Sequence, residues 1–141
     1  PTSTGAAKAI GLVIPELKGK LNGVSVRVPV PNVSLIDLVV ELEQDITVET
    51  INAALKQAAT ESMRGIVEYC ETPLVSIDFL DNSHSAIIDA PSTMVVGKRT
   101  AKILAWYDNE WGYSCRVIDL ASFMGERLAD VQQPLQVRNA G

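Results

Sequence analysis

The sequence is poor in the residues from which metal centres and disulfide frameworks are built. Its 141 residues include one histidine, His84, and two cysteines, Cys70 and Cys115, which do not have C-x-x-C spacing. Structural zinc sites need four Cys or His ligands, so the composition indicates that no metal is bound. Without a disulfide framework, a reducing cytoplasm is the simplest setting for this chain.

An excess of basic residues and long apolar runs are also lacking. The net charge of −5 and the pI near 4.8 argue against a general electrostatic attraction to nucleic acid. No apolar run approaches the roughly 18 residues that a membrane-spanning helix needs. The hydrophobic fraction of 47% excludes a disordered chain and is enough for a core at this length. The sequence therefore predicts a soluble folded domain that binds neither nucleic acid nor membrane.

The two ends of the sequence differ from its middle. The chain begins at Pro1, without Met and without the charged and apolar leader of a signal peptide, so we expect an internal cut there. From Asp130 to Gly141 no periodicity is visible, which predicts a loose tail. We therefore expect one catalytic-domain segment over 1–129 and a tail over 130–141.

Hydrophobic periodicity predicts the order helix, two strands, helix, five strands, helix. The helices are expected over 6–14, from a cap at Thr47 to about 62, and after the last strand to about 128. The strands are expected over 24–30, 33–43, 65–70, 74–80, 85–90, 93–96 and 101–107. Because βαβ alternation is absent, we predict an α+β fold with a largely antiparallel mixed sheet and helices on one face.

Two places in the first part of the chain are suited to an anion. Arg27 is an isolated charge among alternating valines, and a guanidinium holds a phosphate monoester through two parallel N–H bonds. Solvent exposure on a one-sided sheet explains Arg27 equally well. Thr4 and Gly5 precede the first predicted helix, where free N–H groups and the helix dipole attract anions. An ordinary N-cap is the commoner role of such residues.

The segment Trp106–Ser114, which reads WYDNEWGYS, joins the last predicted strand to the last helix. Asp108, Asn109 and Glu110 within it are able either to cap the helix or to offer an amide to a ligand. Together with RVIDLA, which follows after Cys115, this segment closely resembles the C-terminal junction of phosphorylating glyceraldehyde-3-phosphate dehydrogenases. The segments TGAAKA from position 4, PELKGKL from position 15 and RVP from position 27 are also typical of that family. The similarity extends from the first residue to about Leu128.

The resemblance implies a set of site residues. Asn109 is implied to bind the nicotinamide carboxamide of NAD or NADP, with Tyr113 nearby. Thr4 and Gly5 are implied to contact a phosphate, and Arg27 to bind the phosphate of the substrate. These assignments come from the family and not from spacing.

Other parts of the family's active site have no match in this chain. No G-x-G-x-x-G follows a strand, so the dinucleotide-binding domain is missing and is the expected N-terminal partner. The Ser-Cys-Thr-Thr-Asn-Cys setting of the nucleophile is absent, and His84 does not match the catalytic histidine. Cys70 and Cys115 are expected to be small core residues. We therefore expect no catalytic residue in this segment and no activity of the isolated chain.

The resemblance implies a complete enzyme that converts glyceraldehyde 3-phosphate, inorganic phosphate and NAD(P) to 1,3-bisphosphoglycerate in glycolysis. The choice between NAD and NADP is made in the missing domain. The alternatives are an erythrose-4-phosphate dehydrogenase and a non-catalytic binding or assembly module derived from the family. The family's tetramers imply a homo-oligomer, and the apolar residues on the second face of strand 33–43 agree with this.

Overall fold

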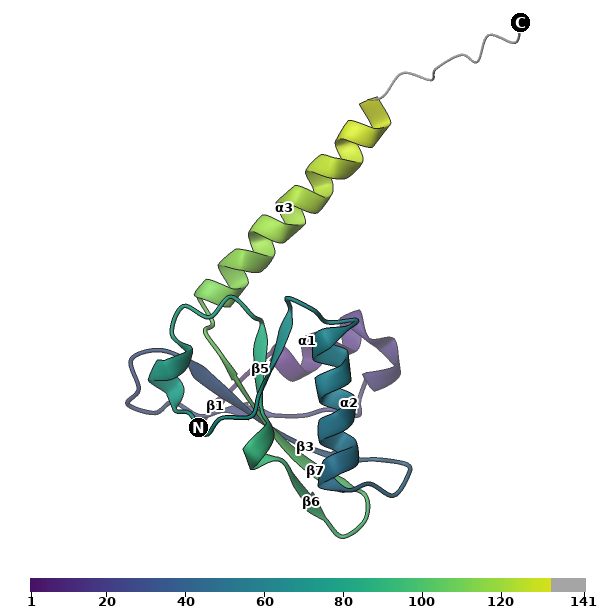
Figure 1. Ribbon diagram of the computed structural model, residues 1–141, viewed down its shortest axis with the longest axis vertical. Helices are drawn as coiled ribbons and strands as arrows, with labels where there is room; N and C mark the ends of the chain where they lie inside the picture. The colour runs from purple at the N-terminus through teal and green to yellow at the C-terminus, as the bar shows by residue number, and fades with distance from the viewer. Residues whose placement is uncertain (133–141) are drawn as a thin grey trace, which may run out of the picture. The chain divides into compact units, whose positions relative to one another are not determined.

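The computed structural model describes residues 1–132, including their side chains except at positions 7–8 and 129–132. Figure 1 shows the helices and strands of the chain, whose contacts divide into two compact units. The first unit is Pro1–Pro31, and the second begins at Asn32. Among the described residues, no helix combines the length and the apolar character that crossing a membrane requires.

The first unit is built from short elements. They are β1 (Thr2–Ser3), α1 (Ala6–Val13), the 3-10 helix η1 (Pro15–Leu17) and β2 (Val24–Ser25). The strands β1 and β2 pair antiparallel, with Thr2 opposite Ser25. Pro15 lacks the N–H that would continue α1, and the chain turns there into η1. The helix predicted over 6–14 is thereby confirmed.

The strand predicted over 24–30 is wrong beyond Ser25. The partner strand β1 offers only Thr2 and Ser3 for pairing, and Pro29 has no N–H to donate to a ladder. The four alternating valines therefore share no buried face. Val24, Val26, Val28 and Val30 are all 43–70% exposed. Arg27 lies in an irregular exposed segment and not in a valine strand.

The second unit holds a five-stranded mixed sheet with the strand order β3-β7-β5-β4, and β6 also pairs with β7. Its elements in chain order are β3 (Ser34–Glu41), α2 (Val48–Thr60), β4 (Val67–Cys70), η2 (Ser76–Phe79), β5 (Ala86–Asp89), η3 (Ala90–Ser92), β6 (Met94–Val96), β7 (Thr100–Tyr107) and α3 (Trp111–Gln132). The pairs are antiparallel except for β4 with β5. The predicted α+β class with a largely antiparallel mixed sheet is confirmed.

The helix α2 begins where the sequence predicts. The Thr47 Oγ1 accepts from the Thr50 N–H at 3.2 Å, and the Thr47 N–H donates to the Thr50 Oγ1 at 2.9 Å. This reciprocal pair satisfies two of the donors that every helix start leaves free. The helix ends at Thr60, slightly before the predicted end.

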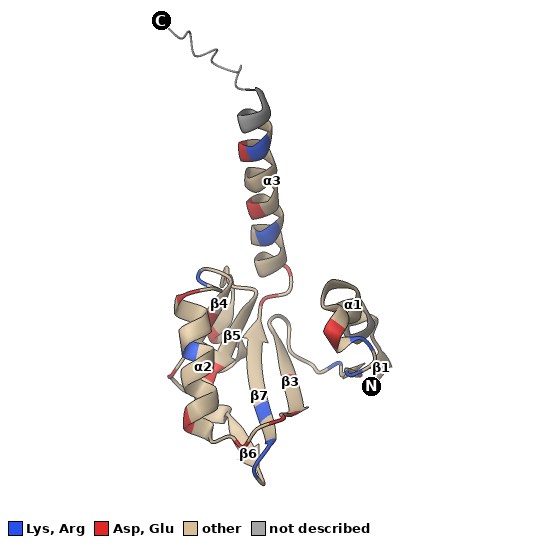
Figure 2. Cartoon of the chain, turned by 90° about the vertical axis from the view of Figure 1, so that its right-hand side faces the viewer, with Lys and Arg blue, Asp and Glu red and all other residues tan. Residues whose placement is uncertain are grey.

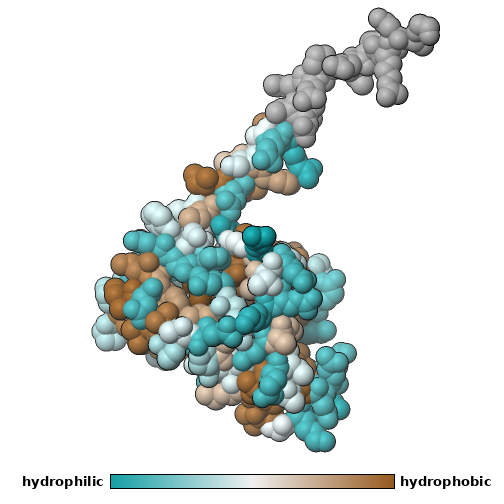
Figure 3. Space-filling view, in the orientation of Figure 1, coloured by the Kyte–Doolittle hydropathy of each residue, from teal (hydrophilic) through white to brown (hydrophobic). Residues whose placement is uncertain are grey.

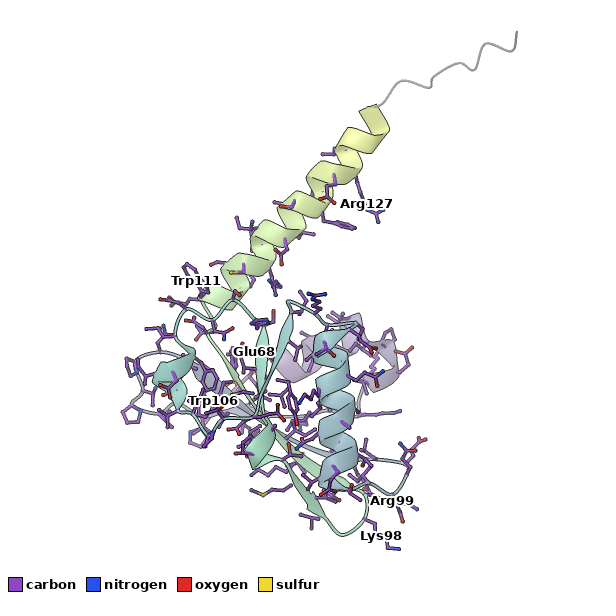
Figure 4. All side chains as sticks on the ribbon, viewed as in Figure 1. Glu68, Lys98, Arg99, Trp106, Trp111 and Arg127 are labelled. Carbon is purple, nitrogen blue, oxygen red and sulfur yellow. The ribbon has the colours of Figure 1, made fainter. Side chains whose placement is uncertain are left out.

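The two faces of the sheet are covered by different elements. On one face the fully buried Ile87 lies opposite Trp106, which is labelled in Figure 4. The Trp106 ring stacks on Phe79 of η2, with ring centroids 5.7 Å apart. Successive strand residues point to opposite faces, so Tyr69 and Ile88, which pair with each other, face the other side. There α2 lies against β4, with the Lys56 ammonium 5.5 Å from the Tyr69 ring.

The strand predicted over 74–80 is replaced by the 3-10 helix η2. The Asp78 carboxylate accepts from the Val75 N–H at 2.9 Å, and the Asp78 N–H donates to the Val75 carbonyl at 3.0 Å. These local bonds take up backbone groups that a strand would offer to a neighbour. Leu74 and Phe79 still pack into the core, which explains why the segment is apolar.

Charged side chains at the β6–β7 turn are solvated. Lys98 and Arg99 lie there, 3.6 and 3.3 Å from the carboxylate of Asp45 (Figures 2 and 4). The Lys98 side chain is 82% exposed, so this pair contributes little to stability.

The helix α3 continues as far as Gln132, past Asp130 where the tail was predicted to begin. Positions 133–141 of that tail lie outside the described residues. Apolar residues along α3, here called the apolar stripe of α3, are exposed, and Figure 3 shows hydrophobic residues at the surface of this helix. Val117, Ile118, Met124 and Leu128 are 46–66% exposed. The stripe is therefore available for packing against another surface.

Candidate functional site

The junction between β7 and α3 is organised by a buried carboxylate. Asp108 is only 2% exposed. Its Oδ1 accepts from the backbone N–H groups of Glu110 at 3.1 Å and Trp111 at 2.9 Å. Its Oδ2 accepts from the Asp81 N–H at 3.1 Å. Asp108 therefore caps the start of α3 and also ties it to the loop after η2.

The pKa of Asp108 reflects two opposing effects. Burial by itself would raise the pKa of this carboxyl, but hydrogen bonds from the N–H groups of Trp111, Asp81 and Glu110 hold the pKa below its usual value. Because the folded-state pKa is lower than about 3.9, the ionised carboxylate stabilises the fold above that pH. This contribution is lost as the pH falls through the lowered pKa.

Asn109 presents its side chain to solvent beside this cap. Because Asp108 supplies the cap, the amide of Asn109 is not used for that purpose. The hydroxyl of Ser34 approaches the Asn109 Oδ1 at 3.5 Å, the limit of a hydrogen bond. Tyr113, four residues further, is 71% exposed. The bond from the Gly112 N–H to the Asp108 carbonyl is of helical type, and Tyr113 follows Asn109 by about one helical turn.

The first turns of α3 are docked on loops of the sheet. A Cβ added at Gly112 would lie 2.9 Å from the carbonyl oxygen of His84, closer than real Cβ contacts. One turn further, the Arg116 Nη1 donates to the Gly65 carbonyl at 3.2 Å and lies 3.5 Å from the Ser85 hydroxyl. The start of α3 is thus held at a fixed place over these loops (Trp111 in Figure 4).

His84 is bound within its own loop. Its Nδ1 lies 2.9 Å from the Asn82 Oδ1 and 3.2 Å from the Glu68 Oε2. The Asn82 amide in turn donates to the same Glu68 oxygen at 2.8 Å. These contacts tie the loop to β4 and give His84 a structural role. That His84 is not a general base remains a prediction.

The predicted phosphate residues all belong to the first unit. The Thr4 Oγ1 accepts a hydrogen bond from the Ala6 N–H at 3.2 Å, and Ala6 is the first residue of α1. Gly5 directly precedes α1. Arg27 follows β2. Because β1 and β2 are antiparallel, Thr4 and Arg27 leave this ladder at opposite ends. The predicted nicotinamide residues, Asn109 and Tyr113, belong to the second unit.

Both thiols are free and half-buried. The Cys70 Sγ lies 3.3 Å from the Thr72 carbonyl oxygen and borders the core of Val33, Phe79 and Ile87. Cys115 lies within α3. Among the residues that the structure describes, no group of three or more His, Cys, Asp or Glu side chains is placed to hold a metal ion.

The sequence did not single out two contacts of this junction. The first is the contact of Asp108 with Asp81. The sequence offers Asp108, Asn109 and Glu110 as equally suitable caps, and only the burial of Asp108 against Asp81 distinguishes it. The second contact is the bond from the Trp106 indole N–H to the Asp89 carboxylate at 3.1 Å. It depends on the pairing of β5 with β7, which no local pattern reveals.

Two glycines of α3 allow a matched test of this docking. We expect Gly112→Ala to lower the free energy of unfolding by about 1–3 kcal/mol, because its methyl group meets a backbone carbonyl. Gly125→Ala, in the same helix with no atom within 4 Å of the added carbon, should instead raise stability by about 0.5–1 kcal/mol. Urea unfolding followed by circular dichroism measures both. Shifts of the same sign would contradict the docking of Gly112.

Comparison with known proteins places the chain among a family of enzymes. The family model described as "Glyceraldehyde 3-phosphate dehydrogenase, C-terminal domain" matches residues 1–109. The chain is 59% identical over 128 residues to glyceraldehyde-3-phosphate dehydrogenase 2 of Bacillus subtilis, covering 91% of this chain and 38% of that relative. It is 58% identical over 127 residues to the Geobacillus stearothermophilus glyceraldehyde-3-phosphate dehydrogenase, with 90% and 38% covered. It is 62% identical over 124 residues to glyceraldehyde-3-phosphate dehydrogenase 1 of Bacillus cereus, with 88% and 37% covered.

Proposed function

The chain belongs to the family of the glyceraldehyde 3-phosphate dehydrogenase C-terminal domain, and from this premise we propose that it works as part of an NAD(P)-dependent phosphorylating dehydrogenase. The chain spans less than two fifths of the length of its relatives. The complete enzyme would convert glyceraldehyde 3-phosphate, inorganic phosphate and NAD or NADP to 1,3-bisphosphoglycerate in the cytoplasm. This segment would supply contacts to the substrate phosphate and to the nicotinamide. The relatives named above all carry the glyceraldehyde name, which favours this substrate over erythrose 4-phosphate.

The exposed amide of Asn109 is the observation that carries the nicotinamide contact. An Asn side chain offers both a carbonyl acceptor and two N–H donors, which complement the carboxamide of nicotinamide. Asp108 supplies the helix cap, so these groups are available to a ligand. Tyr113, one turn further and 71% exposed, lies where it would border the same ligand. A bound nicotinamide would accept the hydride from the substrate.

The exposed guanidinium of Arg27 supports the phosphate contact. No carboxylate pairs with Arg27 among the ion pairs of the described side chains. A planar fork of N–H donors without a carboxylate partner is suited to a phosphate group. Thr4 and Gly5 would bind phosphate through the N-terminal end of α1, where the helix dipole is positive.

The exposed apolar residues of β3 and α3 support the proposal that this chain packs against partner surfaces. Leu35, Ile36, Leu38 and Val39 of β3 are 37–60% exposed, and the apolar side chains of α3 are exposed as well. Such surfaces are costly to leave in water. We propose that the missing dinucleotide-binding domain and further copies of the enzyme, in a homotetramer, cover them.

Arg27→Ala in the complete enzyme tests the phosphate contact. We expect kcat/KM for glyceraldehyde 3-phosphate to fall about 100-fold, because a charge-assisted bidentate contact contributes about 2–3 kcal/mol. Steady-state kinetics measure this. The control is Arg99→Ala, which removes a guanidinium that pairs with Asp45 at an exposed turn. An unchanged kcat/KM for Arg27→Ala, or an equal loss in both variants, would remove Arg27 from the site.

Asn109→Asp in the complete enzyme tests the nicotinamide contact. The change keeps the size of the side chain but replaces two donors with lone pairs and a charge, so the affinity for NAD should fall by about tenfold or more. Fluorescence titration with NAD measures the affinity. Asn22→Asp, at an exposed position where the side chain accepts from the Gly23 N–H, is the control and should bind NAD normally. If Asn109→Asp binds NAD as the wild type does, the assignment is wrong.

The isolated 141-residue chain should show no reduction of NAD with glyceraldehyde 3-phosphate and phosphate. The reaction needs an activated thiolate and a base beside it. Neither cysteine has a histidine next to it in the sequence, and both should react only slowly with iodoacetamide at neutral pH. Absorbance at the nicotinamide band and mass spectrometry measure these two outcomes. Turnover that disappears when either cysteine is replaced would contradict the proposal that this segment supplies binding contacts but no catalytic residue.

A further inference from the structure

The backbone around Asn109 is fixed on both sides, although its side chain is exposed. Before it, the Asp108 carbonyl accepts from the Gly112 N–H at 3.0 Å. After it, the N–H groups of Glu110 and Trp111 donate to the Asp108 Oδ1 at 3.1 and 2.9 Å. The carbonyl and the side chain of Asp108 therefore accept hydrogen bonds from the three residues that follow Asn109. The backbone position from which the Asn109 side chain extends is therefore set by Asp108.

The other oxygen of Asp108 reaches a part of the chain that is anchored in the core. Its partner is the N–H of Asp81, which adopts a φ of 60°, a left-handed conformation that residues other than glycine rarely take. Two positions earlier, Phe79 is only 3% exposed and stacks on Trp106. Trp106 lies on β7, two positions before Asp108. The contacts form a closed ring from β7 through the core and back to the junction.

We propose that Asp108 is a positioning residue for the nicotinamide contact. Through Oδ1 it holds the first turn of α3, and through Oδ2 it fixes that turn to the loop at Asp81. Together these bonds set the point from which Asn109 offers its amide. This inference rests on the proposed function, because it needs Asn109 to contact the nicotinamide.

The two oxygens have separate roles that substitutions are able to separate. In Asp108→Asn the remaining side-chain oxygen continues to cap α3. The amide NH₂ group then faces the Asp81 N–H, and because both groups are donors, the hydrogen bond to Asp81 is lost. In Asp108→Ser the hydroxyl still serves as an N-cap but is too short to span to the loop as well. Both variants therefore keep the helix start and lose the tie to Asp81.

The test measures the kinetic constants of Asp108→Asn and Asp108→Ser in the complete enzyme. We expect KM for NAD to rise about tenfold in both, because a displaced amide loses its contact with the cofactor. The KM for glyceraldehyde 3-phosphate should change less than twofold. A merely structural role would instead reduce the folded fraction, which lowers kcat and leaves both KM values unchanged. If Asp108→Asn does not fold, Asp108→Ser carries the test.

Two further variants separate the possible outcomes. Asp45→Asn, a matched change in an exposed ion pair at the β6–β7 turn, should leave KM for NAD unaltered. Asn109→Ala should raise KM for NAD at least as much as the Asp108 variants do. A normal KM for NAD in both Asp108 variants, with a raised value in Asn109→Ala, would overturn the positioning role alone. A normal value in Asn109→Ala would overturn the proposed function and this inference together.

Discussion

The junction between β7 and α3 depends on satisfying the negative charge of a buried carboxylate. A carboxylate that is withdrawn from water is costly unless donors replace its hydration, and Asp108 obtains three backbone N–H groups. Two of them are the free donors of a helix start, and the third comes from a left-handed residue. The N–H groups at the start of α3 and in the loop at Asp81 therefore satisfy the carboxylate at the end of β7, and the carboxylate satisfies them. Removing any of these partners leaves the others with unpaired polar groups.

The strand β7 brings this charge to its place. It pairs with β3, β5 and β6, so it is the strand to which most of the sheet is attached. Its Trp106 packs on Phe79 on one face, and its indole N–H reaches Asp89 of the neighbouring strand. The end of β7 is consequently a rigid point, and the residues that follow it inherit that rigidity. A contact to a cofactor gains precision when it starts from such a point.

The sequence predicted those features that depend on neighbouring residues. The helix cap at Thr47, the strands around β3, β5 and β7, and the long last helix all follow from local periodicity and capping chemistry. The sequence-based prediction failed where a structure depends on pairing or contact with residues distant in the chain. The valines of 24–30 alternate as in a strand, but only two residues of β1 are available to pair with them. The segment 74–80 is apolar because Leu74 and Phe79 reach the core, and its backbone closes on itself around Asp78. The burial of Asp108 arises from Asp81, a residue distant in sequence, so no local pattern separates Asp108 from Asn109.

The order of the strands also bears on how the chain is made. Although β7 occupies the inside of the sheet, it follows all the strands with which it pairs. During synthesis β3 is made more than sixty residues before β7, so the backbone N–H and C=O groups of β3 that pair with β7 remain without that partner until Tyr107 has been made. Contacts of such sequence separation form slowly. The sheet is therefore completed only after β7 has been made, and nascent chains that stall before β7 present open strand edges to chaperones or to one another.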